Sequence, residues 1–419
     1  MKKPLSSPPL GWNSWDCYGA AVNEEQLMIN AEYMRDNLKE FGYQYVVCDI
    51  QWYEPKAKNH DYNKFTELCM DEYSRLIPAE NRFPSSKGGK GFKPIADKIH
   101  EMGLKFGIHI MRGIPRQAVH MNTPIKCDGV TARDIAHPFS VCPWNTDMYG
   151  VDSKIKGAQE YYNSIFELYA SWGVDFIKCD DIANTEFKPH DPYSARAEIE
   201  MLRKAIENCG RDMVLSLSPG PAPVSEHEHL NAYADMWRIS GDFWDGWDRL
   251  LHMFDLCESW LPVKKRGAYP DCDMLPVGKL CLCYDGGRWT HFTENEQITM
   301  LTLWSIFSSP LMIGGAMQYN DDFTLRLLTN MEILKMDRTS YDTKQLCRDE
   351  SGAIFTAKGE NCEYLAQFNF EEEAKEMSFD TDKEYALEMW SGEMIKAENG
   401  KITVTVEPHS AKAFKISEI

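Results

Sequence analysis

Short apolar segments alternate with helical segments over roughly the first 320 residues, and eight of them resemble buried β-strands. These eight segments lie at residues 10–15, 43–50, 104–111, 173–180, 213–218, 234–240, 272–275 and 310–314. Strands that are buried on both faces give nearly continuous apolar runs in parallel sheets. Eight βα units within this length correspond to a (β/α)8 (TIM) barrel. The sequence therefore predicts an α/β fold in which a TIM barrel comes first.

The intervening segments complete this prediction. Helices are expected at residues 23–42, 95–102, 157–172, 192–207, 247–260 and 294–307. Two long, polar and turn-rich insertions, 51–92 and 112–149, follow the second and third strands on the side where barrel enzymes build substrate loops. After Thr329 the pattern changes to short alternating segments separated by turns. We expect a barrel over residues 1–328 and a small antiparallel β-sandwich over 329–419.

The excess of acidic over basic residues restricts the classes of molecule that this protein is expected to bind. Acidic residues outnumber basic ones 64 to 45, and the formal net charge is −19. Such a surface repels nucleic acids and anionic membranes, so a neutral substrate is the simpler expectation. The N-terminus has no apolar segment typical of a signal peptide, and no run is long and uncharged enough to span a bilayer. These features predict a soluble, cytoplasmic protein that binds neither nucleic acid nor membrane.

Neither a metal nor an organic cofactor is expected. The thirteen cysteines are an odd number spread along the chain, which favours free thiols over a disulfide framework. No Cys or His spacing resembles a zinc site. The glycines between Ser85 and Gly91 lack the strand-to-helix context of a phosphate-binding loop. Water is the only co-substrate that the sequence requires.

The stretch Gly173–Ala183 is the first candidate for chemistry. It is an apolar strand that ends on Lys178, Asp180 and Asp181. The C-terminal ends of barrel strands form the active-site face, so charges placed there favour catalysis over stability. Asp180 could equally be a capping aspartate for a following helix, with Lys178 as its counter-ion.

Polar or aromatic residues recur at the ends of the other strands. The candidates are Trp15, Asp49, His109, Lys178, Asp180, Ser218, Arg238, Asp242 and Asp273. A barrel would bring them to one rim, forming a pocket with several carboxylates, one lysine, one arginine and stacking aromatics. This composition suits a sugar, and glycoside cleavage needs two carboxyl groups that flank the bond. Lys178 would help to keep a nearby carboxylate ionised.

Each of these residues also has a structural interpretation. Asp242 could cap the helix that follows it, and Asp49 could be a turn residue. His109 could be a hydrogen-bonded core histidine, and Trp15 a core aromatic. Only the assumption of a barrel favours the functional interpretation.

Four motifs in order resemble glycoside hydrolase family 27, the α-galactosidases and α-N-acetylgalactosaminidases. They lie at residues 9–15 (PLGWNSW), 173–180 (GVDFIKCD), 237–242 (WRISGD) and 271–275 (DCDML). The resemblance implies the barrel with its C-terminal β domain and a retaining double displacement. Asp180 would be the nucleophile and Asp242 the general acid/base. It is also the only indication of a homodimer.

The resemblance further implies a set of substrate-binding residues. Trp15 would lie under the sugar, Asp49 and Lys178 would bind ring hydroxyls, and Arg238 would lie near the 2-position. Asp273 would be a further carboxylate of the site. Trp52, His109 and Ser218 complete the predicted set, and well-known members have a tyrosine in place of His109.

Two departures from the family pattern bear on the substrate. The second strand of the family usually ends in Asp-Asp, but here Ile50 follows Asp49. The lost carboxylate ordinarily holds the 4- and 6-hydroxyls of galactose, and its loss would weaken galactose binding by roughly 1.5–3 kcal/mol unless His109 or Gln51 substitutes for it. A sugar without a C6 hydroxyl, such as β-L-arabinopyranose, then becomes plausible. By contrast, the small residues of loop 216–222 (SLSPGPA) favour room for an N-acetyl group.

The sequence therefore predicts a retaining exo-glycosidase that acts on an oligosaccharide or glycoside and removes terminal α-galactosyl or α-N-acetylgalactosaminyl residues. One alternative keeps this chemistry but uses another glycone, a β-L-arabinopyranoside or an α-glucoside. The other is a non-catalytic carbohydrate-binding barrel.

Overall fold

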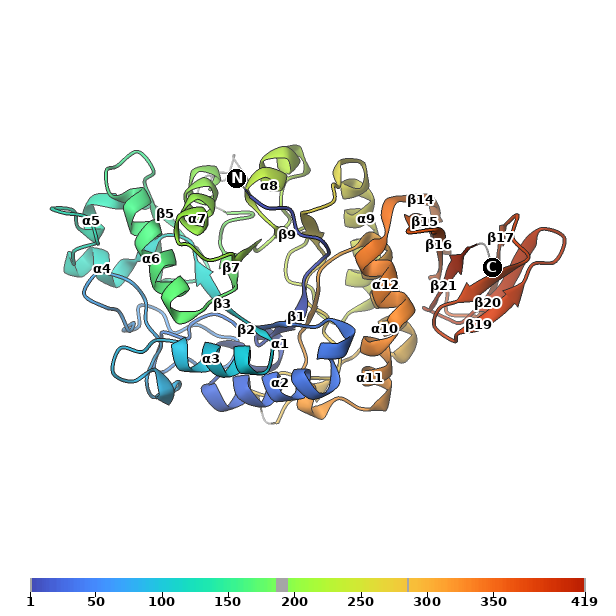
Figure 1. Cartoon of the computed structure of the whole chain (residues 1–419), viewed down its shortest axis with the longest axis horizontal. Coiled ribbons are helices and arrows are strands. Elements are labelled where there is room, and N and C mark those ends of the chain that lie inside the picture. Colours follow the sequence, from blue (N-terminus) through green and yellow to red (C-terminus); the bar gives the residue numbers. More distant parts are fainter. Residues whose placement is uncertain (1, 186–194, 285, 418–419) are drawn as a thin grey trace.

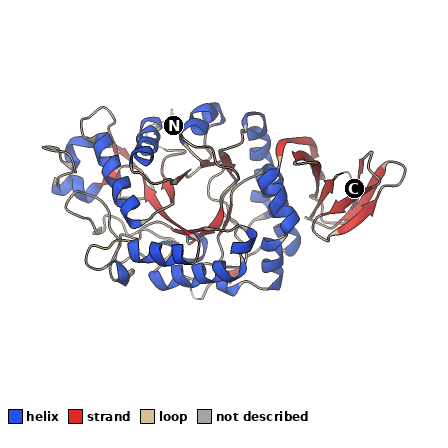
Figure 2. Ribbon diagram, in the orientation of Figure 1, coloured by secondary structure: helices blue, strands red, loops and turns tan. Residues whose placement is uncertain are grey.

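The computed structural model describes residues 2–185, 195–284 and 286–417. An eight-stranded parallel sheet curves around the centre of the N-terminal part, with helices outside it (Figures 1 and 2). In spatial order its strands are β10 (Tyr269–Asp271), β9 (Met236–Arg238), β8 (Val214–Leu217), β7 (Phe176–Asp180), β3 (Lys105–Met111), β2 (Tyr45–Cys48), β1 (Leu10–Asn13) and β13 (Leu311–Ile313). Leu275 joins the two ends of this sheet, because its N–H donates to Met312 O at 2.8 Å and its carbonyl accepts from Gly314 N at 2.9 Å. The predicted TIM-like barrel is confirmed.

One strand differs in position from the prediction. The seventh strand, expected at residues 272–275, is β10 at Tyr269–Asp271. The chain leaves the ladder after Asp271 because Asp273 adopts a left-handed conformation with φ of 83°. Leu275 then returns to the sheet only as an isolated bridge to Ile313. The predicted segment is therefore the turn that carries Asp273, directly beyond the strand.

The helices surround the sheet and mostly match the expected segments. They are α1 (Trp15–Tyr18), α2 (Glu24–Asn37), α3 (Lys93–Glu101), α6 (Ala158–Trp172), α7 (Arg196–Asn208), α8 (His227–Tyr233), α9 (Trp247–Trp260) and α10 (Glu294–Phe307). Capping boxes start α2, with Asn23 and Gln26, and α10, with Thr293 and Glu296. The expected start of α7, residues 192–194, lies outside the described residues. The short helix α8 was not predicted, because its seven residues carry too little apolar periodicity.

The second insertion contains structure that the sequence did not predict. It forms β4 (Ile114–Pro115), α4 (Arg116–Met121), α5 (Ala132–Ile135), β5 (Ala136–Val141) and β6 (Met148–Val151), with the strands in the order β4-β6-β5. Arg112 fixes this insertion to the barrel, because its buried guanidinium donates to Ser140 Oγ at 2.7 Å and pairs with Asp181 and Glu198, each at 2.9 Å. These strands are short and include Pro115, Pro138 and Gly150, so they give little periodic signal and the sequence indicated only a loop.

The C-terminal part consists of antiparallel sheets, as predicted. After α11 (Asp322–Thr329) and α12 (Met331–Thr339), one sheet has the order β14 (Tyr341–Asp349), β15 (Gly352–Gly359), β16 (Cys362–Asn369), β21 (Ala411–Ile416), β18 (Tyr385–Glu388) and β19 (Glu393–Lys396). A second sheet pairs β17 (Lys375–Asp380) with β20 (Lys401–Val406). Leu365, Phe379, Ile402 and Phe414 form a shared apolar cluster. The division of the chain at residue 328 stays a prediction.

Helix α10 connects the barrel with the C-terminal sheet. It contacts β16 and β21, and most of its residues are buried. The buried residues of α10 include polar ones, and these are hydrogen-bonded: Thr299 Oγ1 donates to His409 O at 2.7 Å, and Thr302 Oγ1 donates to Ile298 O at 2.6 Å. All thirteen cysteines are free thiols. Among the described residues, no helix has both the length and the apolar character needed to cross a bilayer.

The contact between α9 and the C-terminal sheet leads to a stability prediction. Phe254 on α9 is fully buried, with ring centroids 4.9 Å from Phe368 and 4.8 Å from Phe370. Phe254→Ala should lower the free energy of unfolding by about 3–5 kcal/mol because it leaves a cavity in this cluster. The expected readout is a lower Tm in calorimetry. Leu346→Ala, at a leucine of β14 that is 59% exposed, is the control and should change stability by less than about 0.5 kcal/mol. Equal Tm values for the two variants would contradict the prediction.

Candidate active site

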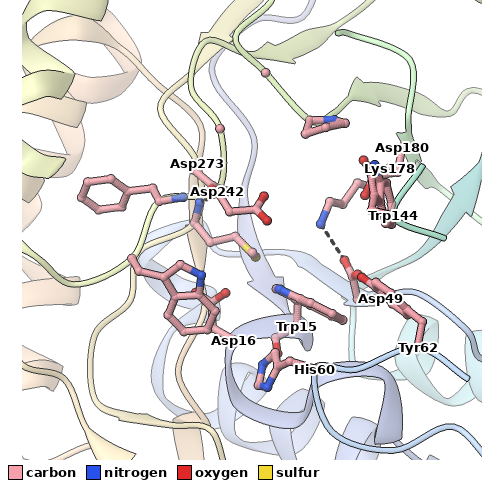
Figure 3. Close-up of a pocket in the computed structure, with 16 residues that line it drawn as sticks. Trp15, Asp16, Asp49, His60, Tyr62, Trp144, Lys178, Asp180, Asp242 and Asp273 are labelled. Carbon is pink, nitrogen blue, oxygen red and sulfur yellow. Dashed lines mark hydrogen bonds and ion pairs between the residues drawn. The ribbon is translucent and has the colours of Figure 1, made fainter. Parts of the chain in front are cut away.

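A cavity of about 430 Å³ opens at the C-terminal ends of the barrel strands (Figure 3). Its volume lies in the usual range for small-molecule sites, about 300–1,000 Å³. It is lined by Trp15, Asp16, Asp49, His60, Tyr62, Trp144, Lys178, Asp180, Pro219, Gly220, Gly241, Asp242, Phe243, Trp244, Asp273 and Met274. Most of these residues follow barrel strands, and the two insertions supply His60, Tyr62 and Trp144. The barrel thus brings together six of the ten residues that the sequence assigned to the site.

A buried ion pair lies at the floor of this cavity. Lys178 Nζ donates to Asp49 Oδ2 at 2.8 Å, and Asn13 Nδ2 donates to the same oxygen at 2.8 Å. The other oxygen, Oδ1, accepts the Ile50 N–H at 2.8 Å. Burial alone would raise the pKa of Asp49, but the Lys178 ammonium and these hydrogen bonds hold it well below its usual range. Burial alone would lower the pKa of Lys178, but the attraction of the Asp49 carboxylate is stronger and raises it. Both groups are therefore charged at neutral pH.

Asp180 is also held in its ionised form. His109 Nε2 lies 3.0 Å from Asp180 Oδ2, and the Asp181 N–H donates to Oδ1 at 3.0 Å. Burial would raise the pKa of Asp180, but the His109 hydrogen bond and the charge of Lys178 lower it below its usual value. The chain turns sharply at Asp181, which has φ of 54° and points its carboxylate away to Arg112. An ionised carboxylate in a mostly buried position is suited to act as a nucleophile.

A second group of carboxylates lies across the cavity from Asp180 (Figure 3). The side chain of Asp242 is 64% exposed, and its Oδ1 lies 3.3 Å from Arg238 Nη2. The same guanidinium nitrogen lies 2.7 Å from Asp273 Oδ2, and it also donates to the carbonyl of Gly241. Burial raises the pKa of Asp273 to about 7, although Arg238 opposes this shift. Arg238 and Asp273 thereby fix the loop that carries Asp242.

Aromatic side chains enclose the mouth of the cavity. Trp15 stacks on Tyr62 with ring centroids 5.9 Å apart and an interplanar angle of 16°. Tyr62 is in turn 5.6 Å from Trp144. His60 contacts the edges of Trp15 and Trp244, at 4.8 and 5.7 Å. Flat apolar faces beside charged oxygen atoms are what a pyranose ring requires.

Four predicted residues do not line the cavity. His109 and Arg238 are buried behind the cavity. His109 is hydrogen-bonded to Asp180, and Arg238 is paired with Asp242 and Asp273, which all line the cavity. Ser218 is buried just before the lining residues Pro219 and Gly220.

Trp52 is a correction to the predicted set of substrate-binding residues. Its indole is fully buried, donates from Nε1 to His109 O at 2.8 Å and packs against Tyr53, Phe92 and Trp172. It supports His109 from the core and cannot contact a sugar.

The sequence did not indicate several lining residues. His60, Tyr62 and Trp144 come from insertions without periodicity, so no sequence signal places them at the site. Asp16 directly follows Trp15, the last residue of the motif at residues 9–15, and could have been found from that position. Its buried Oδ2 has no hydrogen-bond partner among the described residues, and burial together with the Asp273 charge raises its pKa well above the usual value. Within the described ranges, no cluster of three or more His, Cys, Asp or Glu side chains is arranged to hold a metal.

Comparison with known proteins agrees with this geometry. The family described as alpha galactosidase A matches residues 148–339. The crystal structure of a glycoside hydrolase family 27 β-L-arabinopyranosidase from Geobacillus stearothermophilus is 50% identical, covers 99% of this chain and 97% of that chain, and superposes with a TM-score of 0.95. The chain belongs to glycoside hydrolase family 27. It is accordingly a glycoside hydrolase built on a TIM barrel.

Two further relatives show the range of sequence identity among the matches. A Bacillus halodurans protein, provisionally described as an α-N-acetylgalactosaminidase, is 46% identical over the whole of both chains, with a TM-score of 0.89. Alpha-galactosidase 2 of Arabidopsis thaliana is 24% identical over 98% of this chain and 89% of its own length. A variant of the Geobacillus enzyme has been crystallised with arabinose. The relatives of this chain are thus described by different glycones.

The ion pair at the floor of the cavity leads to the second prediction. Lys178→Met should lower the free energy of unfolding at pH 7 by about 3–5 kcal/mol, because it leaves the Asp49 carboxylate buried without its partner. Without the Lys178 ammonium, burial raises the pKa of Asp49 in the folded variant above its unfolded value near 4. The folded variant then takes up a proton at a higher pH than its unfolded chain, so its stability rises as the pH falls towards 4. The depressed pKa of Asp49 in the unaltered protein loses its contribution only below this range, so the Tm deficit of the variant should narrow between pH 7 and pH 4. A deficit that is constant or grows over this range would contradict the assignment.

Proposed function

We propose that this family 27 enzyme is a retaining exo-glycosidase that hydrolyses terminal β-L-arabinopyranosides. β-L-Arabinopyranose has the ring configuration of α-D-galactose but carries no C6 hydroxymethyl group. The observation that carries the proposal is the environment of position 50. There, a carboxylate that would hold the 4- and 6-hydroxyls of galactose is replaced by an isoleucine that is 1% exposed.

The neighbouring residues do not compensate for this replacement. Gln51 Nε2 donates to Asp147 Oδ2 at 3.0 Å, and His109 Nε2 is engaged with Asp180. Both side chains are fully buried and, like Ile50 itself, are not among the residues that line the cavity, so residues 50, 51 and 109 offer no free polar group there. A galactose C6 hydroxyl would lose its water contacts near Ile50 without gaining a partner there, which is costly. A pentopyranose such as arabinopyranose has no C6 hydroxyl and avoids this desolvation cost.

The comparisons support the same glycone. The 50% identical relative from Geobacillus stearothermophilus is described as a β-L-arabinopyranosidase, and its variant was crystallised with arabinose. The relatives named α-galactosidases are more distant, as the 24% identity of the Arabidopsis protein illustrates. Similarity at 50% identity over the whole chain favours a shared glycone over the galactose-type substrates that the sequence first indicated.

The geometry supports the double displacement expected for this family. The ionised carboxylate of Asp180 attacks the anomeric carbon, while the bond from that carbon to the leaving-group oxygen breaks. Asp242, across the cavity, gives its proton to that oxygen and becomes a carboxylate. Asp49 and Lys178 bind the ring hydroxyls, and Trp15 supplies the apolar face under the ring.

The second step regenerates the enzyme. Asp242 removes a proton from a water molecule whose oxygen attacks the anomeric carbon, and the bond to Asp180 breaks. The two inversions give net retention. The exposure of Asp242 suits this role, because water must reach it after the aglycone has left.

One observation favours a second candidate, an α-N-acetylgalactosaminide. Pro219 and Gly220 line the cavity without long side chains, which leaves room beside the 2-position. The 46% identical relative carries the matching provisional description. This candidate shares all the catalytic residues, so only substrate rates distinguish it.

The deciding measurement is a set of initial rates on p-nitrophenyl glycosides. The panel contains the β-L-arabinopyranoside, α-galactoside, α-N-acetylgalactosaminide and α-glucoside. The arabinopyranoside should have the highest kcat/KM, and Asp180→Asn should abolish turnover without lowering Tm by more than a few degrees. A higher kcat/KM for the N-acetyl substrate would replace the first candidate with the second. Cleavage of none of the four would refute both.

A substitution at Ile50 tests the origin of this specificity. Ile50→Asp should raise kcat/KM for the α-galactoside, relative to the arabinopyranoside, by about 10- to 100-fold, because it restores a charge-assisted partner for the C6 hydroxyl. Ile50→Val keeps an apolar side chain and is the matched control, for which the ratio should stay within about twofold. If the aspartate variant is folded, as judged by Tm, and its ratio is unchanged, Ile50 does not determine the glycone.

A further inference from the structure

A second cavity, of about 400 Å³, adjoins the sugar-binding cavity. The two share one wall, the segment Gly241–Phe243, so Asp242 borders both. The rest of the second cavity comes from Pro221, Ser240 and helix α9. Gly241 is exposed and nothing lies within 4 Å of the position that its Cβ would occupy, so no side chain separates the two cavities at this residue. A molecule bound at Asp242 can therefore extend from one cavity towards the other.

The proposed reaction determines the direction in which the leaving group points. Asp242 lies on one side of the sugar-binding cavity, whereas Asp180 and Trp144 lie on the opposite side (Figure 3). The aglycone is bonded to the oxygen that Asp242 protonates, and the two carboxyl groups flank the bond that breaks. The aglycone must therefore lie on the Asp242 side, away from Trp144. The second cavity lies on that side.

The wall between the two cavities is held from both sides. The Phe243 N–H donates to the buried Asp273 Oδ2 at 2.8 Å. Arg249 Nη1, which belongs to the second cavity, donates to Asp242 O at 3.0 Å. A loop fixed at both faces keeps the acid in register with the leaving-group oxygen while the aglycone lies against it.

The lining of the second cavity indicates the chemistry of its ligand. Pro221, Phe243, Met253 and Leu256 provide an apolar surface, and the exposed side chains of Asp248, Arg249 and His252 lie around it. The second cavity has two carboxylates, Asp242 and Asp248, whereas five aspartates line the sugar-binding cavity. An aromatic ring buries well on such a surface, and the guanidinium of Arg249 at its edge is attracted to the ring face. Ser240 lines the same cavity, and its buried hydroxyl has no hydrogen-bond partner among the described residues, so it can pair with a further hydroxyl on the ring, while the phenolic oxygen bonded to the sugar is the one that Asp242 protonates.

We propose that this second cavity is the aglycone subsite and that it takes an aromatic, phenolic leaving group. The inference rests on the proposed function, because it needs Asp242 to act as the acid. It adds a substrate class, aryl β-L-arabinopyranosides, and a specificity-determining residue, Leu256. Leu256 is half-buried on α9 and lies outside the sugar-binding cavity.

The test compares kcat/KM for phenyl and methyl β-L-arabinopyranosides. The intrinsic reactivities of the two leaving groups cancel when the phenyl-to-methyl ratio of a variant is divided by that of the unaltered enzyme. In Leu256→Ala this ratio should fall about five- to tenfold, because apolar contacts with the ring are lost. Leu256→Met preserves the apolar volume and should restore the ratio to within about twofold. Leu346→Ala, a substitution of a leucine that lines neither cavity, should leave the ratio unchanged.

Competitive inhibition by free L-arabinose separates the two subsites. Its inhibition constant should be the same in Leu256→Ala as in the unaltered enzyme, since the glycone does not reach α9. A phenyl-to-methyl ratio that is unchanged in Leu256→Ala, or an equal loss on both glycosides, would overturn the aglycone subsite while the proposed function stands. Failure of the unaltered enzyme to hydrolyse either arabinopyranoside would overturn the proposed function, and the subsite with it.

Discussion

The site depends on the buried ammonium of Lys178, which lies between the carboxylates of Asp49 and Asp180. Placing charged groups in the interior is costly unless they are paired, and removing one partner of such a set leaves an uncompensated charge. Lys178 donates to Asp49 at 2.8 Å and lowers the pKa values of both carboxylates. One lysine thereby keeps a sugar-binding carboxylate and the proposed nucleophile ionised together. Because Lys178 and Asp180 are two residues apart on β7, they lie on the same face of the strand, and a single strand supplies both groups.

The sequence predicted the part of the site that the barrel itself builds. Asp49, Lys178 and Asp180 lie at or directly beyond strand ends, and the parallel order of the strands dictates that such residues meet at one rim. Asp273 was also found, although the strand before it was placed three residues too late. The error was harmless because the left-handed turn at Asp273 still directs the chain to the rim.

What the sequence could not predict depends on packing between distant segments. Tyr62 and Trp144 belong to different insertions and meet only because the folded loops bring them over Trp15. Trp52 shows the opposite error. It follows Asp49 in the chain and was expected to face the sugar, but its indole fills the core between Phe92 and Trp172 and donates to the carbonyl of His109. Sequence proximity to a site residue does not determine which side of the strand end a large side chain occupies.

The two halves of the site differ in how firmly they are held, and this difference has a chemical purpose. The floor, with Asp49, Lys178 and Asp180, is mostly buried, which keeps the nucleophile and the ring hydroxyl partners in fixed positions. Asp242 is 64% exposed on a loop, yet the buried Arg238–Asp273 pair holds that loop through Gly241 O and the Phe243 N–H. Asp242 must contact the leaving group in the first step and a water molecule in the second, so one side of its carboxyl group has to be accessible from solvent. Recognition of the glycone can therefore be strict at the floor, while recognition of the aglycone is left to the surface beyond Asp242.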